Sequence, residues 1–229
     1  MTERFVYGFA VSLDRLWDLV GSGLDADELL ATVDREFIDM FADEFAPPIS
    51  LNGCARDVLT GRLVEDRAYP YARLVEPVLT LVAEPLGMIH MAYTYYLPND
   101  AFGRWNPVLE TLGLRRLAAL WATRNCAFPW PRGRSPVVDW PCVTELAPAA
   151  LVDVGAELAR DWRTGLGMLA DTALTDGGQD VAAGARGELG GGLHQLTDWV
   201  ERAAAPWTSD RRCVGPTGNS LVLVMDGGQ

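Results

Sequence analysis

Three segments of the chain have the side-chain composition or the alternation that is typical of β-strands. Residues 5–11, "FVYGFAV", are β-branched and aromatic around a central glycine. In residues 88–97 every odd position is apolar or aromatic and the even positions are mixed, which indicates a strand with one face fully buried. The apolar run at residues 219–226 is the third candidate strand, and a candidate partner for the first. The pattern predicts a small sheet built from N-terminal, central and C-terminal strands.

Most of the remaining chain has apolar positions three and four residues apart, as amphipathic helices do. Ser12 stands where a helix N-cap is expected, a second helix begins near Asp25, and Pro148 opens a later one. Pro77 is expected to kink or split its helix, and the glycines at 190–192 are expected to break the last one. The predicted helices are 13–20, 25–41, 52–61, 70–82, 107–112, 114–121, 148–162 and 180–204.

Together these elements predict an α+β fold, a mostly helical single domain with residues 145–205 as a candidate helical subdomain. The length of 229 residues and the hydrophobic fraction of 49% are sufficient for one large core. No run of about 18 uncharged apolar residues is present, so no membrane span is expected. The start, "MTERFVYGFA", lacks a basic segment followed by a sustained apolar run, which predicts a cytoplasmic protein without a signal peptide.

The negative charge of the chain is concentrated in its first part. Residues 1–66 carry 14 acidic residues and five arginines, so they contribute −9 of the net charge of −12. Residues 67–150 carry a net charge of +2. An acidic surface repels phosphate backbones, so nucleic-acid binding is not expected. Two interpretations stay open: the acidic surface binds a basic protein partner, or it keeps the protein soluble.

Several chemistries are excluded because the chain contains 19 arginines and no lysine. Walker A loops, Schiff-base and pyridoxal-phosphate enzymes and serine–lysine nucleophiles all require a lysine. The run "GSGLDA" at residues 21–26 matches a dinucleotide pattern, but helical periodicity precedes it where a strand is required. The four cysteines and two histidines are far apart, so no metal site and no cofactor are expected.

The two histidines differ in their surroundings. His90 lies on the mixed face of the central strand among aromatic residues, which makes it the candidate catalytic residue. The alternative is a half-buried histidine with satisfied hydrogen bonds. His194 precedes Asp198 by one helical turn, which predicts a surface pair between them.

A proline-rich connection is the best candidate for a ligand site. Residues 128–141, "FPWPRGRSPVVDWP", alternate aromatic bulk with positive charge in the one part of the chain that is not net acidic. They could line a cleft for an anionic or aromatic small molecule, or the tryptophans could simply pin the loop to the body. The candidate ligand-binding residues are Tyr96, Arg104, Trp105, Trp130, Arg132 and Trp140.

Four stretches resemble a family of uncharacterised bacterial cytoplasmic proteins over residues 5–165. They are "VSLDRLWDLVGSG", "RAYPYARLVEPVLTLVAEPLG", "W…LETLGLRRL", and "AFPWPRG" followed by "DWP". The two ends of the chain also resemble the YfbM-like family of unknown function, whose members pair an N-terminal helix with a C-terminal strand. These motifs are hydrophobic and turn residues, so the resemblance implies a fold rather than an activity.

Two functional hypotheses follow. The first is a non-catalytic interaction protein, of the immunity or regulatory type, with an acidic surface for a basic partner. The alternative is a small-molecule-binding protein or enzyme that uses an aromatic/arginine cleft around residues 104–140. The first requires fewer assumptions, because no recognisable nucleophile motif is present.

Overall fold

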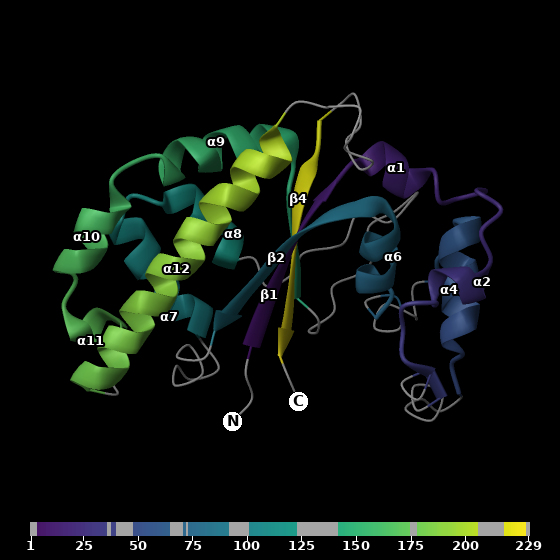
Figure 1. The fold of residues 1–229 in the computed structure, drawn as a ribbon, viewed down its shortest axis with the longest axis horizontal. Helices are drawn as coiled ribbons and strands as arrows, with labels where there is room; N and C mark the ends of the chain where they lie inside the picture. The colour runs from purple at the N-terminus through teal and green to yellow at the C-terminus, as the bar shows by residue number, and fades with distance from the viewer. Residues whose placement is uncertain are drawn as a thin grey trace.

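The computed structural model describes most of the chain and confirms the α+β fold. Its sheet contains four antiparallel strands in the order β2-β1-β4-β3 (Figure 1). The strands are β1 (Arg4–Val11), β2 (Ala83–Met91), β3 (Cys142–Leu146) and β4 (Ser220–Gly227). The described residues are 4–35, 38–39, 48–64, 71, 73–91, 101–122, 142–174, 178–205 and 218–227.

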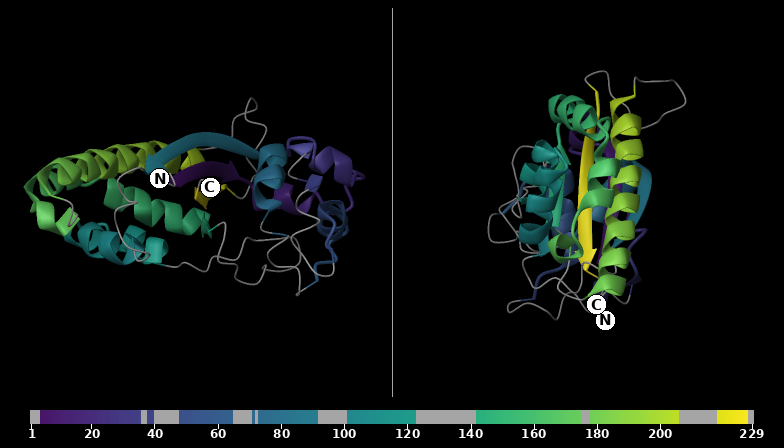
Figure 2. Two further views of the ribbon diagram at one scale, coloured as in Figure 1. Left: turned by 90° about the horizontal axis from the view of Figure 1, so that it is seen from below. Right: turned by 90° about the vertical axis from the view of Figure 1, so that its left-hand side faces the viewer.

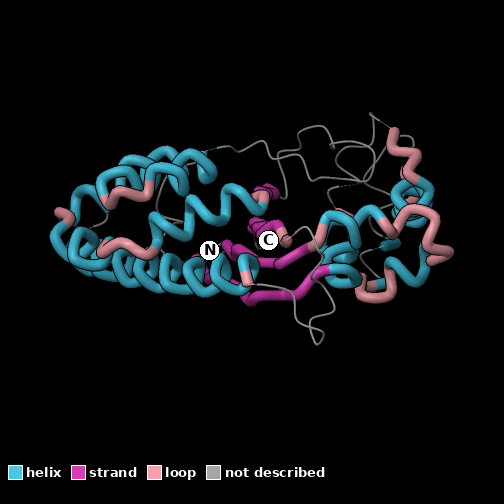
Figure 3. Tube along the Cα trace, turned by 90° about the horizontal axis from the view of Figure 1, so that it is seen from above, coloured by secondary structure: helices cyan, strands magenta, loops and turns pink. Residues whose placement is uncertain are grey.

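Helices cover both faces of the sheet. On one face lie α1 (Leu13–Trp17), α2 (Ala26–Leu29), α4 (Leu51–Thr60) and α6 (Val75–Val82), which we call the N-terminal lobe. On the other lie α7 (Ala101–Thr111), α8 (Arg115–Ala122), α9 (Pro148–Leu158), α10 (Trp162–Met168), α11 (Asp171–Leu174) and α12 (Gln179–Ala204), the C-terminal lobe. Figures 2 and 3 show the strands between the two groups of helices.

The alternation of side chains along the strands explains this arrangement. In β1, Val6 and Ala10 join the core of the C-terminal lobe, whereas Phe9 and Val11 join the core of the N-terminal lobe. Strand β4 divides in the same way between odd and even positions. Because successive side chains of a strand point to opposite faces, one sheet supplies apolar side chains to both cores.

The predicted strands are confirmed, with corrected bounds and one addition. The predicted pairing of the C-terminal strand with β1 is also confirmed. Strand β2 begins at Ala83, five residues before the predicted start, and it contains Pro85. A proline is tolerated there because β2 is an edge strand and its register shifts between Gly8 and Phe9 of β1. Residues 92–97 lie outside the described part. Strand β3 was not predicted, because its five residues are too short to show a clear period.

The prediction of a break in the last helix is wrong, since α12 runs without interruption through the glycines at 190–192. Its buried stripe of leucines holds it to the sheet across that run. Two of the glycines permit close packing: a Cβ at Gly190 would lie 3.3 Å from Leu166, and one at Gly192 would lie 3.4 Å from Ile89. A side chain at Gly190 would therefore require a small shift of Leu166, whereas one at Gly192 would meet Ile89 at an ordinary contact distance.

Three further helix predictions need correction. Helix α6 begins at Val75 instead of residue 70, so Pro77 falls in its first turn, where no intrahelical N–H bond is lost. Helix α7 begins at Ala101 and contains Pro107, which was predicted to open it. Helix α2 ends at Leu29, whereas a helix to residue 41 was predicted; part of that range lies outside the described residues.

A close contact joins α12 to the sheet. A Cβ added at Gly8 of β1 would lie 2.5 Å from the Trp199 ring, closer than real Cβ atoms approach. The Trp199 side chain is fully buried, and its Nε1 donates a hydrogen bond of 3.0 Å to the carbonyl of Leu86. The glycine in "FVYGFAV" is therefore the position at which the indole rests on the strand.

Candidate functional site

The aromatic/arginine cleft falls mostly on residues that the structure does not describe. Tyr96, Trp130, Arg132 and Trp140 lie outside the described residues. Helix α7 contains Arg104 and Trp105 in its first half. The cleft around residues 104–140 therefore stays a prediction.

His90 lies on β2, directly opposite Phe5 of β1. Its ring stacks on the Phe5 ring, with centroids 5.1 Å apart and an interplanar angle of 16°. The imidazole is exposed to solvent, and it lies beside an aromatic ring rather than at the bottom of a cavity. The aromatic residues that follow His90 in the sequence lie outside the described residues, so a catalytic role of His90 stays a prediction.

The predicted pair between His194 and Asp198 is not formed. The Arg163 guanidinium of α10 donates to Nδ1 of His194 at 3.1 Å. Asp198 instead lies 3.8 Å from Arg202 on the same helix. The neighbouring helix supplies a donor that the spacing along α12 could not indicate.

A pocket of about 470 Å³ lies beside the N-terminus of α4. Its wall includes the N-cap Ser50 with Arg35 and Arg56, a combination that favours small anions. The hydroxyl of Ser50 already accepts a hydrogen bond from the Gly53 N–H at 3.3 Å. Arg35 is paired with Asp39 at 3.8 Å. Little unneutralised positive charge remains in this pocket beyond Arg56.

One buried tyrosine has a clearly shifted ionisation. Burial raises the pKa of Tyr71 to about 12. Its hydroxyl donates to Asp57 Oδ2 at 2.9 Å and accepts from the Val64 N–H at 2.9 Å. These bonds connect the residues that follow α4 to the helix itself, so the raised pKa of Tyr71 reflects packing rather than catalysis.

Within the described residues, no group of three or more histidine, cysteine or carboxylate side chains could hold a metal ion. No helix in that part of the chain is both long and apolar enough to cross a membrane.

The surface of the N-terminal lobe between α1 and α2 has a different character. Leu16, Leu19 and Leu29 of this segment are buried in the lobe's core. The main-chain N–H of Gly21 donates to the Leu59 carbonyl of α4 at 3.1 Å, which ties the connecting loop to that helix. Because the apolar positions face inward, the polar positions between them face solvent. We call four of them the acidic surface: Asp18, Asp25, Asp27 and Glu28.

Three of these carboxylates are held by neutral donors. Asp25 and Glu28 form a capping box at the start of α2, in which each side chain accepts the other's main-chain N–H at 2.8 Å. Asp27 Oδ1 accepts a hydrogen bond of 2.8 Å from the Asn52 amide of α4. Hydrogen bonds of this kind orient a carboxylate without neutralising it. No arginine among the described residues pairs with any of the four, so their negative charge remains available.

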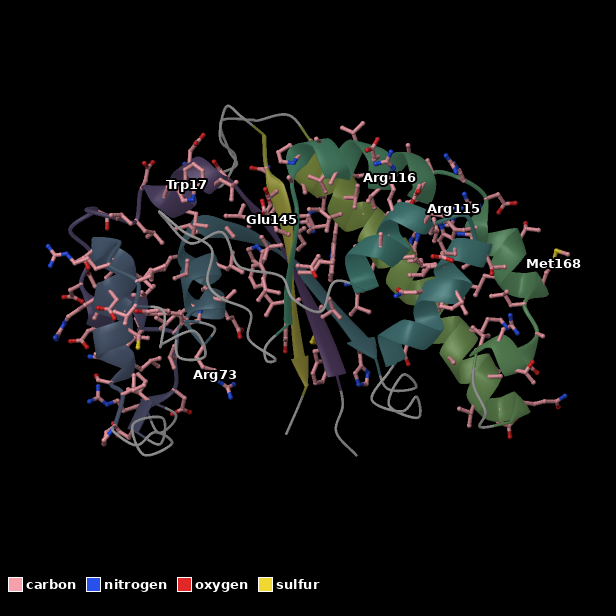
Figure 4. The ribbon with its side chains drawn as sticks, turned by 180° about the vertical axis from the view of Figure 1, so that it is seen from behind. Trp17, Arg73, Arg115, Arg116, Glu145 and Met168 are labelled. Atoms are coloured by element: carbon pink, nitrogen blue, oxygen red, sulfur yellow. The ribbon has the colours of Figure 1, made fainter. Side chains whose placement is uncertain are left out.

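An exposed aromatic residue adjoins the acidic surface. Trp17 is the last residue of α1 and directly precedes Asp18, and 48% of its surface is exposed. Figure 4 shows its side chain on the outer side of the N-terminal lobe. Large aromatic side chains are frequent energetic anchors of protein interfaces, and their faces attract arginine and lysine. An exposed tryptophan next to the exposed Asp18 is suited to contact a basic side chain of a partner.

Comparisons of the chain with protein-family models, with curated proteins and with solved structures find no match. The resemblance noted from the sequence therefore stays a prediction.

Proposed function

We propose that this protein is a cytoplasmic, non-catalytic interaction protein, of the immunity or regulatory type, that binds a basic protein partner through the acidic surface. The observation that carries the proposal is the set of four exposed carboxylates that no described arginine neutralises, next to the exposed Trp17. Complementary charge raises the association rate and the specificity of binding, and a central aromatic side chain supplies much of the affinity.

The rigidity of the surface supports the same function. The capping box fixes Asp25 and Glu28, and the bond from Asn52 fixes Asp27 relative to α4. Carboxylates that are already oriented lose less conformational entropy when a partner binds. The acidic surface is therefore prepared for a partner before binding takes place.

The test uses a variant that removes charge and keeps shape, with Asp18→Asn, Asp25→Asn, Asp27→Asn and Glu28→Gln combined. Asparagine is as good an N-cap as aspartate, so α2 should remain intact. A partner captured from lysate on the wild-type protein at low salt is first purified. Its affinity for each variant is then measured by calorimetry at low and at moderate salt. Exposed charge pairs contribute roughly 0.2–1 kcal/mol each, so four lost charges should weaken binding by at least about fourfold and by up to several hundredfold.

The matched control changes the same number of charges on the C-terminal lobe, with Asp161→Asn, Asp180→Asn, Asp198→Asn and Glu201→Gln. This variant has the same net charge as the first, so a general charge effect would weaken both equally. We expect the control to bind as the wild type does. A partner that binds the acidic-surface variant with wild-type affinity, or whose binding does not weaken with salt, would show that the proposal is wrong.

A further inference from the structure

The edge of strand β2 is covered by side chains from α12. Strand β2 is the first strand of the sheet order, and within the described residues only β1 borders it. The side-chain amide of Gln195 donates to the Met88 carbonyl at 2.9 Å. Trp199 Nε1 and Arg202 Nη1 both donate to the Leu86 carbonyl, at 3.0 and 3.3 Å. Main-chain acceptors of an edge strand are thus occupied by donors from a helix.

The spacing of helix and strand makes this series possible. Gln195, Trp199 and Arg202 are four and three residues apart, so they lie on one face of α12. Their contacts on β2 fall at every second residue. Gln195 bonds Met88, and both Trp199 and Arg202 bond Leu86. Arg202 Nη2 also bonds Glu84 Oε1 at 2.7 Å. One turn of a helix advances about 5.4 Å and two residues of a strand advance about 6.6 Å. Side chains one turn apart on α12 can therefore reach residues two positions apart on β2.

An edge strand with unpaired main-chain groups is a template for pairing with another chain. At nine residues, β2 is long enough for such pairing, whereas β3 at the opposite edge has five. Pro85 and the register shift beside Gly8 disrupt only the first part of β2. The part beyond them, around Met88, is protected by Gln195.

We propose that Gln195 and Arg202 protect the edge of β2 from pairing with the same strand of a second copy of this chain. Both residues lie on the side of α12 that faces β2, and both side chains are only partly buried. Trp199 already anchors the helix, since it is fully buried and in contact with Gly8. The two polar residues supply donors from partly exposed side chains, whereas the buried indole supplies both a donor to Leu86 and packing.

The test removes the two polar side chains, with Gln195→Ala and Arg202→Ala combined. Trp199 keeps its bond to Leu86, so the main-chain acceptor that the variant exposes is the Met88 carbonyl. The molar mass is followed by light scattering after gel filtration over a wide range of protein concentration. We expect the mean mass of the variant to rise with concentration towards at least twice the monomer mass, while the wild type does not change. The matched control is Gln179→Ala with Arg115→Ala, which removes exposed side chains of the same types away from β2. It should behave as the wild type does.

A rescue variant separates edge pairing from simple loosening of α12. Met88 is 44% exposed, so Met88→Lys can be added to the double variant without disturbing the core. A lysine on an edge strand opposes pairing, because two copies would bring ammonium groups together. The double variant should also unfold at a lower urea concentration than the wild type, because α12 has lost hydrogen bonds. Adding Met88→Lys should restore the wild-type molar mass without restoring this urea midpoint. Association that persists with Met88→Lys would overturn the proposal, because it would not pass through β2.

A folded double variant whose mass stays that of the wild type at every concentration would also overturn the proposal. If the double variant does not fold, Gln195→Ala alone serves as the test, since it removes one hydrogen bond from a partly exposed side chain. The single variant should then associate measurably, with hydrogen exchange at residues 88–90 slower in the associated form. Unchanged mass in this folded single variant would show that the edge needs no protection.

Discussion

At the scale of single residues, the glycines of α12 fall into two kinds. A Cβ at Gly190 would press against Leu166 and one at Gly192 would touch Ile89, whereas one at Gly187 or Gly191 would meet nothing within 4 Å. Glycine within a helix costs roughly 0.5–1 kcal/mol relative to alanine, because it loses more backbone entropy on folding. The exposed pair therefore lowers the stability of α12 without any gain in packing.

We expect Gly187→Ala and Gly191→Ala each to raise the free energy of unfolding by about 0.5–1 kcal/mol. For a chain of this size that corresponds to roughly 2–4 °C per kcal/mol in the thermal midpoint. The measurement is urea unfolding followed by circular dichroism. Gly190→Ala is the internal comparison, and it should gain less or lose stability, because Leu166 has to move. An equal rise in the free energy of unfolding at all three positions would mean that the close approach of Leu166 to Gly190 does not destabilise an alanine there.

At the scale of elements, helix α8 receives its N-terminal cap from another helix. The residue before α8 is Leu114, which has no side-chain acceptor. The Glu157 carboxylate of α9 accepts the main-chain N–H of Arg116 at 3.0 Å and that of Leu117 at 3.3 Å. Only 7% of Glu157 is exposed. A negative charge at these orphan amides satisfies the helix end and its dipole together.

We expect Glu157→Gln to lower the free energy of unfolding by about 1–2 kcal/mol, because the cap loses its charge and one acceptor oxygen. Asp153→Asn is the matched control, since it removes the same charge from the same helix. Asp153 is half exposed and forms an ion pair with Arg116, so its loss should cost less than about 0.5 kcal/mol. Chemical denaturation of both variants measures the difference. Equal losses would show that burial of Glu157 adds nothing to its role as a cap.

This cap illustrates what the sequence could and could not predict about the elements. Local composition identified β1 and β4, which are rich in β-branched and other apolar residues, and apolar residues at helical spacing identified α8. It failed where an element depends on a distant neighbour. Strand β2 tolerates Pro85 because it is an edge strand, and α12 tolerates its glycines because its leucines are buried in the core of the C-terminal lobe. The contacts of Glu157, Gln195 and Arg202 join residues 40 or more positions apart, so no local pattern reveals them.

The candidate site was predicted in part. The charge of the first 66 residues indicated an acidic surface but not which residues form it. The exposure of Trp17 was not predicted, because helical spacing placed it in the apolar stripe with Leu13, Leu16 and Val20. Only the packed lobe distinguishes a tryptophan at the edge of that stripe from one inside it.

At the scale of the whole molecule, one sheet serves two cores. Val6 and Phe9 of the same strand belong to different cores, and β4 is divided in the same way. Neither lobe can lose β1 or β4 without exposing apolar side chains of the other. We therefore expect both lobes to unfold in one cooperative transition, although a helical subdomain at residues 145–205 was considered from the sequence.

Gly8→Ala tests this cooperativity, because the added methyl group strains only the side of β1 that faces α12. Overpacking against the buried Trp199 should lower the free energy of unfolding by roughly 2 kcal/mol, which is about a thirtyfold loss of hydrogen-exchange protection. If the sheet couples the lobes, the most protected amides of α4 should lose as much protection as those of α12, although α4 lies on the opposite face. Gly53→Ala, in α4 itself, is the control, since its Cβ would meet only Ser50 at an ordinary 3.7 Å. Loss of protection confined to α12 would instead mean that the C-terminal lobe opens as a separate unit, with β1 remaining paired to β4 in the N-terminal lobe.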